Sequence, residues 1–447
     1  MVRQRVGVLD AAHRHGGIRG QAVKGAHRIV IVGGGFAGVR TALELVKRRA
    51  RLKAFEVVLV DRETSHVYNP LLYEVCTGGL GDGGASAREL RAGVAVPFSD
   101  FERRVKKSAL RFVRGDLSGI DEEAREILLR DGRRLGYDDF VIALGAVPNT
   151  FSTPGVAEHA YFLKWLPDAI RIRERIATFL EAQRKGKEKR VCVLVAGGGP
   201  TGVEFAAELA NFLHRLTYAG KLPRDAWHVR IVEAGPSVLP NHPEKVRARA
   251  GARLDRLGVE IMTGTKVVSV ESGRACLAIE GDGEECVREA DVVVWAGGIR
   301  PPESVKALRL PTDAKGWIAV TPTFAVKGKE HVWALGDATS FLHPKTGGRV
   351  PALAQAATRE AAIVAENVTR GLERRLPLTW IPPEHWMTVT PLGGRYAIAD
   401  LGRVVLSDGL GYLARKVADF LYFSSILPLR RAIHVWVRGT RAYSKND

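Results

Sequence analysis

Short apolar runs that end in glycine recur along the chain and alternate with stretches of helical periodicity. Runs of this kind lack the polar alternation of a half-exposed sheet and are typical of parallel strands whose carboxyl ends open onto a ligand. The pattern therefore predicts an α/β fold with parallel sheets. Beyond the two glycine-rich units described next, the predicted strands of this type are Tyr137–Gly145, Ala290–Gly298 and His331–Gly336.

The first glycine-rich unit follows an apolar strand that begins at His27. The strand leads into Gly33, Gly35 and Gly38, which open a helical stretch, and a second strand ends at Asp61. Glycines at this spacing permit a tight turn, close approach of the backbone to a pyrophosphate, and close packing of helix on strand. The Asp61 carboxylate suits the hydroxyls of a ribose. The unit predicts a dinucleotide site.

The second unit repeats this arrangement at Gly197, Gly199 and Gly202, and its later strand, 228–232, ends at Glu233. An acid at this position favours a free 2′-hydroxyl, so we expect NADH rather than NADPH. Two nucleotide sites in one polypeptide indicate that one nucleotide stays bound while the other visits, since electrons must pass between two ring systems. The chain is therefore expected to contain two Rossmann-like dinucleotide-binding domains, which is the arrangement of a flavoprotein reductase.

Composition narrows the class of protein further. Hydrophobic residues make up 46% and charged residues 26% of the 447 residues, which is usual for folded domains. No apolar run approaches the roughly 18 residues of a membrane-spanning helix, so we expect none. The cysteines are too scattered for a disulfide framework, a zinc site or a redox-active pair, which predicts a reducing compartment and no metal. They are Cys76, Cys192, Cys276 and Cys286.

The chain carries 67 Lys and Arg against 49 Asp and Glu, a net charge of +18. Part of this excess lies in residues 1–26, a Gly- and His-rich stretch without an apolar period. We expect a flexible basic extension there, with an organelle transit peptide as the alternative. A basic balance suits nucleic acid, anionic lipid or an acidic cofactor. Because no zinc-finger or RNA-recognition signature is present, we expect no nucleic-acid partner.

The carboxyl end combines an apolar helical stripe with cations. Opposite the stripe lie Arg415, Lys416 and Asp419, and the apolar run that follows ends at Arg430 and Arg431. This combination predicts an amphipathic region that lies on an anionic membrane surface with its cations on head groups. The alternative is a helix docked on the protein's own core or on the second subunit of a homodimer. The stripe consists of Leu410, Leu413, Ala414, Val417, Phe420 and Leu421.

At this point the residues resemble the two-dinucleotide-binding-domain flavoproteins and, among them, the type II NADH:quinone oxidoreductases. The resemblance runs from about His27 to about Gly402, and the segment around Asn69–Tyr73 points to the quinone-reducing branch. The segments that carry it are Gly33–Gly38, His66–Tyr73, Gly197–Glu204, Val294–Gly298 and Ala334–Ala338.

The resemblance implies FAD in the first unit and NADH in the second. It implies that Asp337 binds the flavin's ribityl chain and that a helix opened by Ala354 and Gln355 points its N-terminus at the isoalloxazine ring, where it would stabilise negative charge. Glu204 would reach the nicotinamide, and Glu204 and Gln355 are the candidate catalytic residues. The expected cofactor contacts are Gly33, Gly35, Gly38, Asp61, Gly145, Gly336, Asp337, Ala354, Gln355, Gly197, Gly199, Gly202, Glu233 and Gly298.

The implied reaction is transfer of electrons from NADH through FAD to a membrane quinone, without proton pumping, by a peripheral protein on the cytoplasmic face. Where the family usually has two glutamines, this chain has Arg359 and Glu360, and an ion pair there would alter the quinone preference or the acceptor. Three alternatives remain: a sulfide:quinone oxidoreductase, an NAD(P)H reductase of a soluble acceptor such as a ferredoxin, and a non-catalytic nucleotide-binding redox sensor.

The expected domain organisation follows from the order of these units. An FAD-binding domain made of two segments encloses the NADH-binding domain, and a membrane-association region closes the chain. The expected ranges are 1–26 for the basic extension, 27–164 and 299–385 for the FAD-binding domain, 165–298 for the NADH-binding domain, and 386–447 for the membrane-association region.

Overall fold

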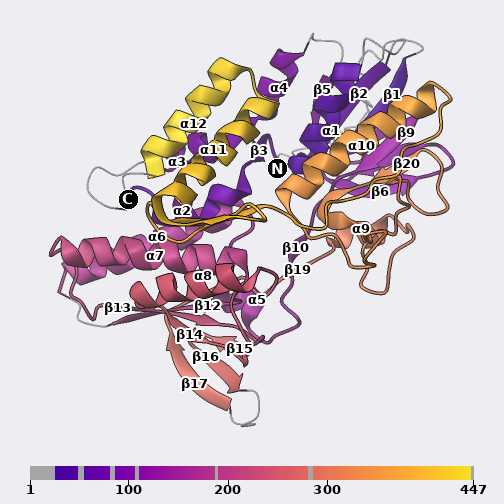
Figure 1. Cartoon of the computed structure of the whole chain (residues 1–447). Coiled ribbons are helices and arrows are strands. Elements are labelled where there is room, and N and C mark those ends of the chain that lie inside the picture. The colour runs from indigo at the N-terminus through magenta and orange to yellow at the C-terminus, as the bar shows by residue number, and fades with distance from the viewer. Residues whose placement is uncertain are drawn as a thin grey trace, which may run out of the picture.

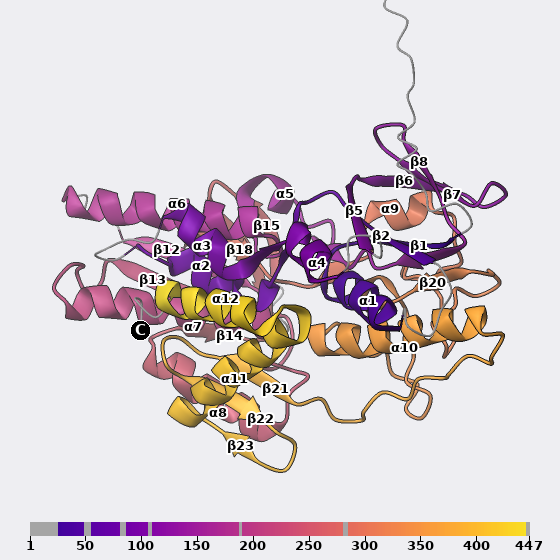
Figure 2. The ribbon, with the colours of Figure 1, turned by 90° about the horizontal axis from the view of Figure 1, so that it is seen from above.

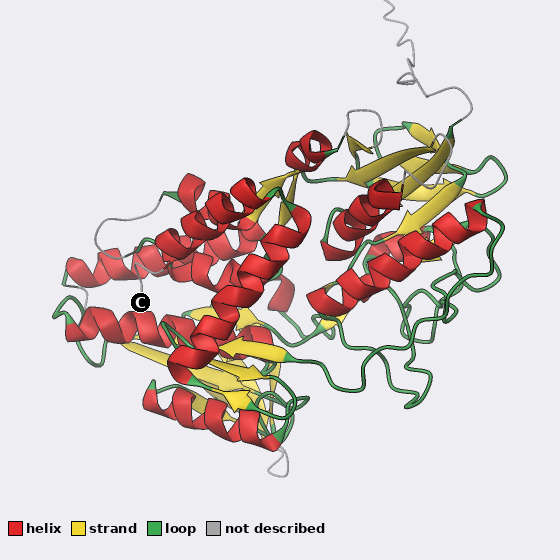
Figure 3. Cartoon of the chain, turned by 45° about the horizontal axis from the view of Figure 1, so that its top comes forward, coloured by secondary structure: helices red, strands yellow, loops and turns green. Residues whose placement is uncertain are grey.

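The computed structural model describes residues 26–48, 55–80, 86–105, 110–186, 190–279 and 285–443. The basic extension expected over 1–26 lies outside these residues, apart from Ala26. Two sheets flanked by helices form the body of the molecule (Figure 3). The α/β fold with two Rossmann-like units is therefore confirmed.

The first unit is a five-stranded parallel sheet in the order β20-β9-β1-β2-β5. Its strands come from two distant parts of the chain, since β20 follows the others by almost two hundred residues. Helices α1 (Phe36–Lys47) and α10 (Ala354–Leu372) lie side by side over it (Figures 1 and 2). The strands are β1 (His27–Val32), β2 (Phe55–Asp61), β5 (Leu110–Arg114), β9 (Asp139–Ile142) and β20 (Val332–Ala334).

The second unit is also a five-stranded parallel sheet, in the order β11-β18-β12-β13-β14. Its strands are β11 (Ala160–Phe162), β12 (Val191–Ala196), β13 (Trp227–Val232), β14 (Glu260–Met262) and β18 (Val292–Trp295). Its helices are α6 (Leu166–Arg184), α7 (Pro200–Tyr218) and α8 (Glu244–Arg256). An antiparallel sheet adjoins it, formed by β15 (Thr265–Glu271), β16 (Gly273–Ile279) and β17 (Glu285–Ala290).

Two chain crossings connect the units, and they pair as β10 (Val147–Pro148) with β19 (Ile299–Arg300). Strand β11 belongs to the second sheet although it precedes residue 164, so the structural boundary lies near β10 rather than at the expected position. The three glycine-ended runs of the sequence correspond to β9, β18 and β20, and all three are parallel strands, as predicted.

Shorter elements complete the described chain. They are β3 (Ser65–Val67), η2 (Asn69–Leu71), α2 (Leu72–Thr77), α3 (Ala87–Val94), β4 (Ala95–Pro97), α4 (Phe98–Arg104), β6 (Leu117–Asp121), β7 (Glu126–Leu129), β8 (Arg134–Gly136), α5 (Val156–His159), α9 (Glu303–Ala307), η3 (Gly336–Ala338), β21 (Thr388–Pro391), β22 (Ala397–Asp400), β23 (Val405–Leu406), α11 (Asp408–Ile426) and α12 (Leu429–Tyr443).

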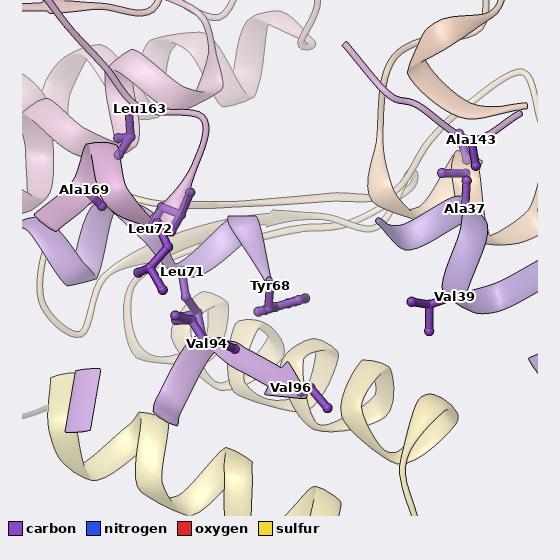
Figure 4. Close-up of a cluster of buried hydrophobic side chains, with 14 of the residues drawn as sticks. Ala37, Val39, Tyr68, Leu71, Leu72, Val94, Val96, Ala143, Leu163 and Ala169 are labelled. Carbon is purple, nitrogen blue, oxygen red and sulfur yellow. The ribbon is translucent and has the colours of Figure 1, made fainter. Parts of the chain in front are cut away.

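One hydrophobic cluster runs through both units and under the carboxyl-terminal helices. Figure 4 shows its centre, where Leu72 lies near Ala169 of the second unit while Ala37 and Ala143 belong to the first. Tyr68, also labelled in Figure 4, lies between β3 and η2, and its hydroxyl donates to Asp419 of α11. The cluster makes the segment 66–77 the meeting point of the two units and the carboxyl end.

Helix α11 reverses the orientation that its sequence led us to expect. The polar residues Arg415, Lys416 and Asp419 are buried, with exposures of 4%, 8% and 4%, while Leu413 of the apolar stripe is 59% exposed. The cations of α11 therefore cannot rest on lipid head groups, and that part of the prediction is wrong. No helix within the described residues is long and apolar enough to cross a bilayer.

The polar side of α11 is buried because it meets a matching polar cluster on the segment 66–77. The Arg415 guanidinium donates to the Tyr73 hydroxyl and lies 3.3 Å from carboxylate oxygens of both Glu74 and Asp419. The Tyr68 hydroxyl donates to Asp419 over 2.8 Å. Arg415, Glu74 and Asp419 thus each have a partner of opposite sign, as a low-dielectric interior requires of buried charges.

Replacing Arg415 with glutamine should lower the free energy of unfolding by about 3–5 kcal/mol, because Glu74 and Asp419 would remain buried without their cation. Urea denaturation at pH 7 measures this loss. The matched control is Arg438→Gln on α12, where the side chain is exposed, and its effect should stay within about 0.5 kcal/mol. Equal effects of the two substitutions would contradict the role of Arg415.

Candidate functional site

In the first glycine turn, neighbouring backbone atoms leave no room for a side chain at Gly33 or Gly38. A Cβ on Gly33 would lie 2.1 Å from the Ala143 carbonyl oxygen, and a Cβ on Gly38 would lie 1.8 Å from that of Gly33. Gly35, the N-cap of α1, differs, because a Cβ there would meet no protein atom within 4 Å. The open space therefore lies in front of Gly35, at the start of α1.

Asp61 holds this turn from the end of β2. Its carboxylate accepts hydrogen bonds from the backbone N–H of Gly34 over 2.5 Å and of Glu63 over 2.7 Å. Burial raises the pKa of the Asp61 carboxyl, and the two N–H groups oppose that rise. Asp61 thus fixes the turn from the end of β2.

The second turn has the same construction. A Cβ on Gly197 would lie 2.5 Å from the Ala296 carbonyl oxygen, and a Cβ on Gly202 would lie 2.0 Å from that of Gly197. Gly199 caps α7 and faces open space. The Glu233 carboxylate accepts from the Gly198 N–H over 2.6 Å and from the Gly235 N–H over 2.7 Å.

Two further glycines from the prediction stand at the ends of central strands. Gly145, after β9, has a φ of +67° and faces open space, while Gly298, after β18, has a φ of +138°. Both conformations favour glycine over residues with a side chain. Gly145 lies two residues after Ala143, whose carbonyl oxygen approaches Gly33 of the first turn.

The turn after β20 joins the first site. A Cβ on Gly336 would lie 3.2 Å from the Cβ of Ala37 in α1. Asp337 lies 3.7 Å from the Lys164 ammonium. Ala354 and Gln355 open α10, whose N-terminus has no side-chain cap, and the Gln355 amide donates to the Met387 carbonyl over 2.6 Å. The structure therefore gathers the residues predicted for the first site around one turn and two helix N-termini.

The first-turn N–H groups of α1, α7 and α10 are without side-chain caps. Such groups need partners and carry partial positive charge, so each N-terminus suits an anion. At α1 and α7 the capping glycines, Gly35 and Gly199, face open space in front of these N–H groups. Both turns thus fit the pyrophosphate of a dinucleotide, and residues of both sites fit FAD and NADH in chemical type.

Glu204, the fifth residue of α7, faces the buried polar cluster around Arg415. Burial is the main cause that raises the pKa of its carboxyl to about 8; Arg415 opposes this rise, while Glu74 and Asp419 add to it. Because the effect of burial outweighs the attraction of the Arg415 guanidinium, Glu204 keeps its proton at neutral pH. Glu204 is therefore a neutral acid beside the second glycine turn.

His66 ties the first turn to the carboxyl end. Its Nδ1 lies 3.0 Å from the Gly34 carbonyl oxygen and its Nε2 lies 2.7 Å from the Tyr422 hydroxyl. Burial lowers the pKa of His66 to about 4, so the ring is neutral, with Nδ1–H donating to Gly34 and Nε2 accepting from Tyr422. The rings of Phe36, Tyr68 and Tyr422 pack against one another beside it.

Arg359 and Glu360 do not form the ion pair expected from the sequence. The Arg359 guanidinium lies 5.4 Å from the centre of the Trp386 ring. The Glu360 carboxylate is buried and accepts from the Gly336 N–H over 2.6 Å. Neighbouring residues of a helix point about 100° apart, so side chains at consecutive positions do not face each other.

Sequence reasoning missed the residues that join the site to α11. For Arg415 and Asp419 a signal was present, because a cation and an acid four residues apart form a pair on one helix face. We expected the cations of that face to lie on lipid head groups. For His66 and Tyr422 no local pattern exists, since 356 positions separate them.

Comparison with known proteins agrees with this geometry. The model of the pyridine nucleotide-disulphide oxidoreductase family matches residues 27–361, three quarters of the chain. The chain belongs to this family. Its described cysteines, Cys76, Cys192 and Cys276, are free, so no disulfide accounts for the family's name here. No group of metal-binding side chains occurs within the same described residues.

Relatives within the family share most of the chain. A type II NADH:quinone oxidoreductase of Haemophilus influenzae is 28% identical over 436 residues, which cover 91% of this chain and 94% of that protein. The structure of NDH2 from Plasmodium falciparum in complex with NADH has a TM-score of 0.78 at 20% identity and covers 94% of this chain and 99% of that one. A sulfide:quinone oxidoreductase from Aquifex aeolicus has a TM-score of 0.73 at 16% identity, covering 90% and 91%.

The raised pKa of Glu204 predicts how stability depends on pH. The folded state keeps a proton that the unfolded state releases above about pH 4.5, so stability should fall as pH rises from about 4.5 to about 8. Glu204→Gln removes this loss and should make the protein more stable than wild type at pH 8 by a few kcal/mol, roughly.

Urea denaturation of both proteins at pH 5.5 and pH 8 measures the difference. Glu303→Gln is the control, because this exposed carboxyl titrates below the window: the pairing with Arg300 lowers its pKa. A Glu204→Gln profile parallel to that of wild type would contradict the assignment.

Proposed function

We propose that this protein is an FAD-dependent oxidoreductase that transfers electrons from NADH to a quinone, without proton translocation. The observation that carries the proposal is the pair of uncapped glycine turns, each with a carboxylate at the end of the next strand, joined through one buried cluster. The match to type II NADH:quinone oxidoreductases over about nine tenths of the chain supports quinone as the acceptor.

Bound FAD would supply the hydride and electron chemistry, while the protein supplies position and charge. In the proposed assignment the first turn, with Asp61, holds the FAD pyrophosphate and adenosine. Asp337 binds the ribityl chain and the N-terminus of α10 faces the ring. The second turn, with Glu233, holds NADH. Glu204, protonated at neutral pH, and Gln355, held by the Met387 carbonyl, are the candidate catalytic side chains.

The alternatives make different demands on the chain. A sulfide:quinone oxidoreductase needs a reactive thiol pair near the flavin. Among the described residues Cys76 is the cysteine closest in sequence to the first site, and burial raises its pKa well above the usual value, which suppresses the reactive thiolate. A reductase of a soluble acceptor would not explain why the leucines of α11 are exposed. A redox sensor would bind both nucleotides without turnover.

Anaerobic spectroscopy tests the proposal. Adding NADH to the FAD-loaded protein should bleach the flavin absorbance, and a short-chain quinone should restore it. Bleaching without recovery would favour a soluble acceptor, bleaching by sulfide would favour the sulfide-oxidising alternative, and binding of NADH without bleaching would favour the sensor. Absence of bound flavin after reconstitution would refute the proposal.

Two glycine variants should separate the sites. Gly35→Ala and Gly199→Ala add a methyl group that meets no protein atom, so both proteins should fold with unchanged stability. The methyl group of Gly35→Ala should weaken FAD binding at least tenfold, and that of Gly199→Ala should weaken NADH binding while FAD stays bound. Fluorescence titration measures both affinities, and Gly251→Ala in α8, also in open space, is the control. Unchanged affinities would contradict the assignment.

The carboxyl-terminal helices support a peripheral position on an anionic membrane. Six apolar side chains of α11 and α12 are exposed by 44% to 64%, and Arg430, Arg438 and Arg441 of α12 are exposed beside them. Apolar side chains flanked by cations suit a lipid interface. The cytoplasmic side is proposed from the cysteine content. The apolar face consists of Leu410, Leu413, Val417, Leu421, Leu429 and Ile433.

Substitutions on this apolar face should release the protein from vesicles. Leu413→Ser, Val417→Ser and Leu421→Ser together should reduce binding to phosphatidylglycerol vesicles at least tenfold in flotation assays, while soluble-quinone activity persists. Leu376→Ser, at a site 85% exposed beyond the end of α10, is the control. Retained vesicle binding would contradict the proposal. If the triple variant instead changes a dimer into a monomer in light scattering, the apolar face is a homodimer interface.

A further inference from the structure

Glu360 is a buried carboxyl that the proposed reaction does not yet use. It is 3% exposed and lies in the middle of the first half of α10. Its carboxylate accepts the Gly336 N–H over 2.6 Å, and both residues line one pocket together with Asp337 and Arg349. Glu360 therefore holds the turn that carries Asp337 through the backbone of Gly336.

The groups around Glu360 bring the pKa of its carboxyl close to neutral pH. Within the described part of the chain no Lys, Arg or His nitrogen comes within 4.0 Å of its carboxylate. Arg349, on the loop before α10, is occupied with the carbonyl oxygens of Asp337 and Thr339 and lies over the Trp317 ring. Burial raises the pKa of Glu360 to about 7; Asp337 adds to this rise, while the Gly336 N–H and Arg349 oppose it.

We propose that Glu360 is a positioning residue of the flavin site that takes up one proton from water when the flavin is reduced and releases it when the flavin is reoxidised. This inference rests on the FAD site proposed above. Reduction places a negative charge at the N-terminus of α10, the helix that carries Glu360. A like charge nearby disfavours the ionised carboxylate, so reduction draws a proton onto Glu360.

The step balances. NADH gives the flavin a hydride, which carries two electrons and one proton, and becomes NAD⁺. The reduced flavin keeps one negative charge, and one proton from water neutralises the Glu360 carboxylate, so NADH and one proton are consumed together. When a quinone takes the hydride equivalent, Glu360 gives up its proton, which matches the second proton of the quinol.

Potentiometric titration of the FAD-loaded protein with redox mediators tests this without turnover. For a two-electron couple each proton taken up adds about 30 mV per pH unit to the slope of the midpoint potential. In wild type the slope should be about 30 mV per pH unit below pH 7 and should about double above pH 7. Glu360→Gln, which still accepts the Gly336 N–H, should keep FAD and show the one-proton slope throughout.

Infrared difference spectra give an independent signature. Reduction at pH 8 should produce the carbonyl band of a newly protonated carboxyl in wild type and in Glu373→Gln, a control at the other end of α10. The band should be absent in Glu360→Gln. A constant one-proton slope in wild type, or a steeper segment and band that persist in Glu360→Gln, would overturn the inference. A protein that fails to transfer electrons to quinone but passes these tests would refute only the proposed acceptor.

Discussion

The structure depends on two contacts in which a glycine lies where a side chain cannot. Gly38 approaches the Gly33 carbonyl, and Gly202 approaches that of Gly197, so closely that a Cβ would lie 1.8 Å and 2.0 Å away. These contacts set α1 and α7 directly over the ends of their strands, with uncapped N–H groups facing open space. Because partial positive charge collects there, the fold itself creates two places for a pyrophosphate.

The buried cluster around Arg415 links these places to the carboxyl end. It holds the polar side of α11 against the segment 66–77, and His66 continues the connection to the Gly34 carbonyl. As a consequence the apolar side of α11 must face outward. One set of ion pairs thus fixes both the wall of the site and the face that we propose meets lipid.

The sequence was sufficient for the features that depend on local pattern. Glycine spacing and apolar runs predicted both sheets and the turn residues, because each of these features is confined to a strand, a turn and the helix that follows. The orientation of α11 was not predictable, since a helical period separates two faces without saying which one finds a partner. The contact of Glu360 was not predictable for a similar reason, because its partner, the Gly336 N–H, lies 24 residues away and is a backbone group.

Two carboxyls with raised pKa values lie on α7 and α10, the helices that open onto the two glycine turns. The pKa of Glu204 is raised to about 8 and that of Glu360 to about 7, in both cases mainly by burial. Exposed acids would be ionised at neutral pH and would repel both the pyrophosphates and a reduced flavin. Burial keeps one acid neutral and leaves the other able to change charge near pH 7. These two carboxyls therefore need not oppose the negative charge that the proposed chemistry creates.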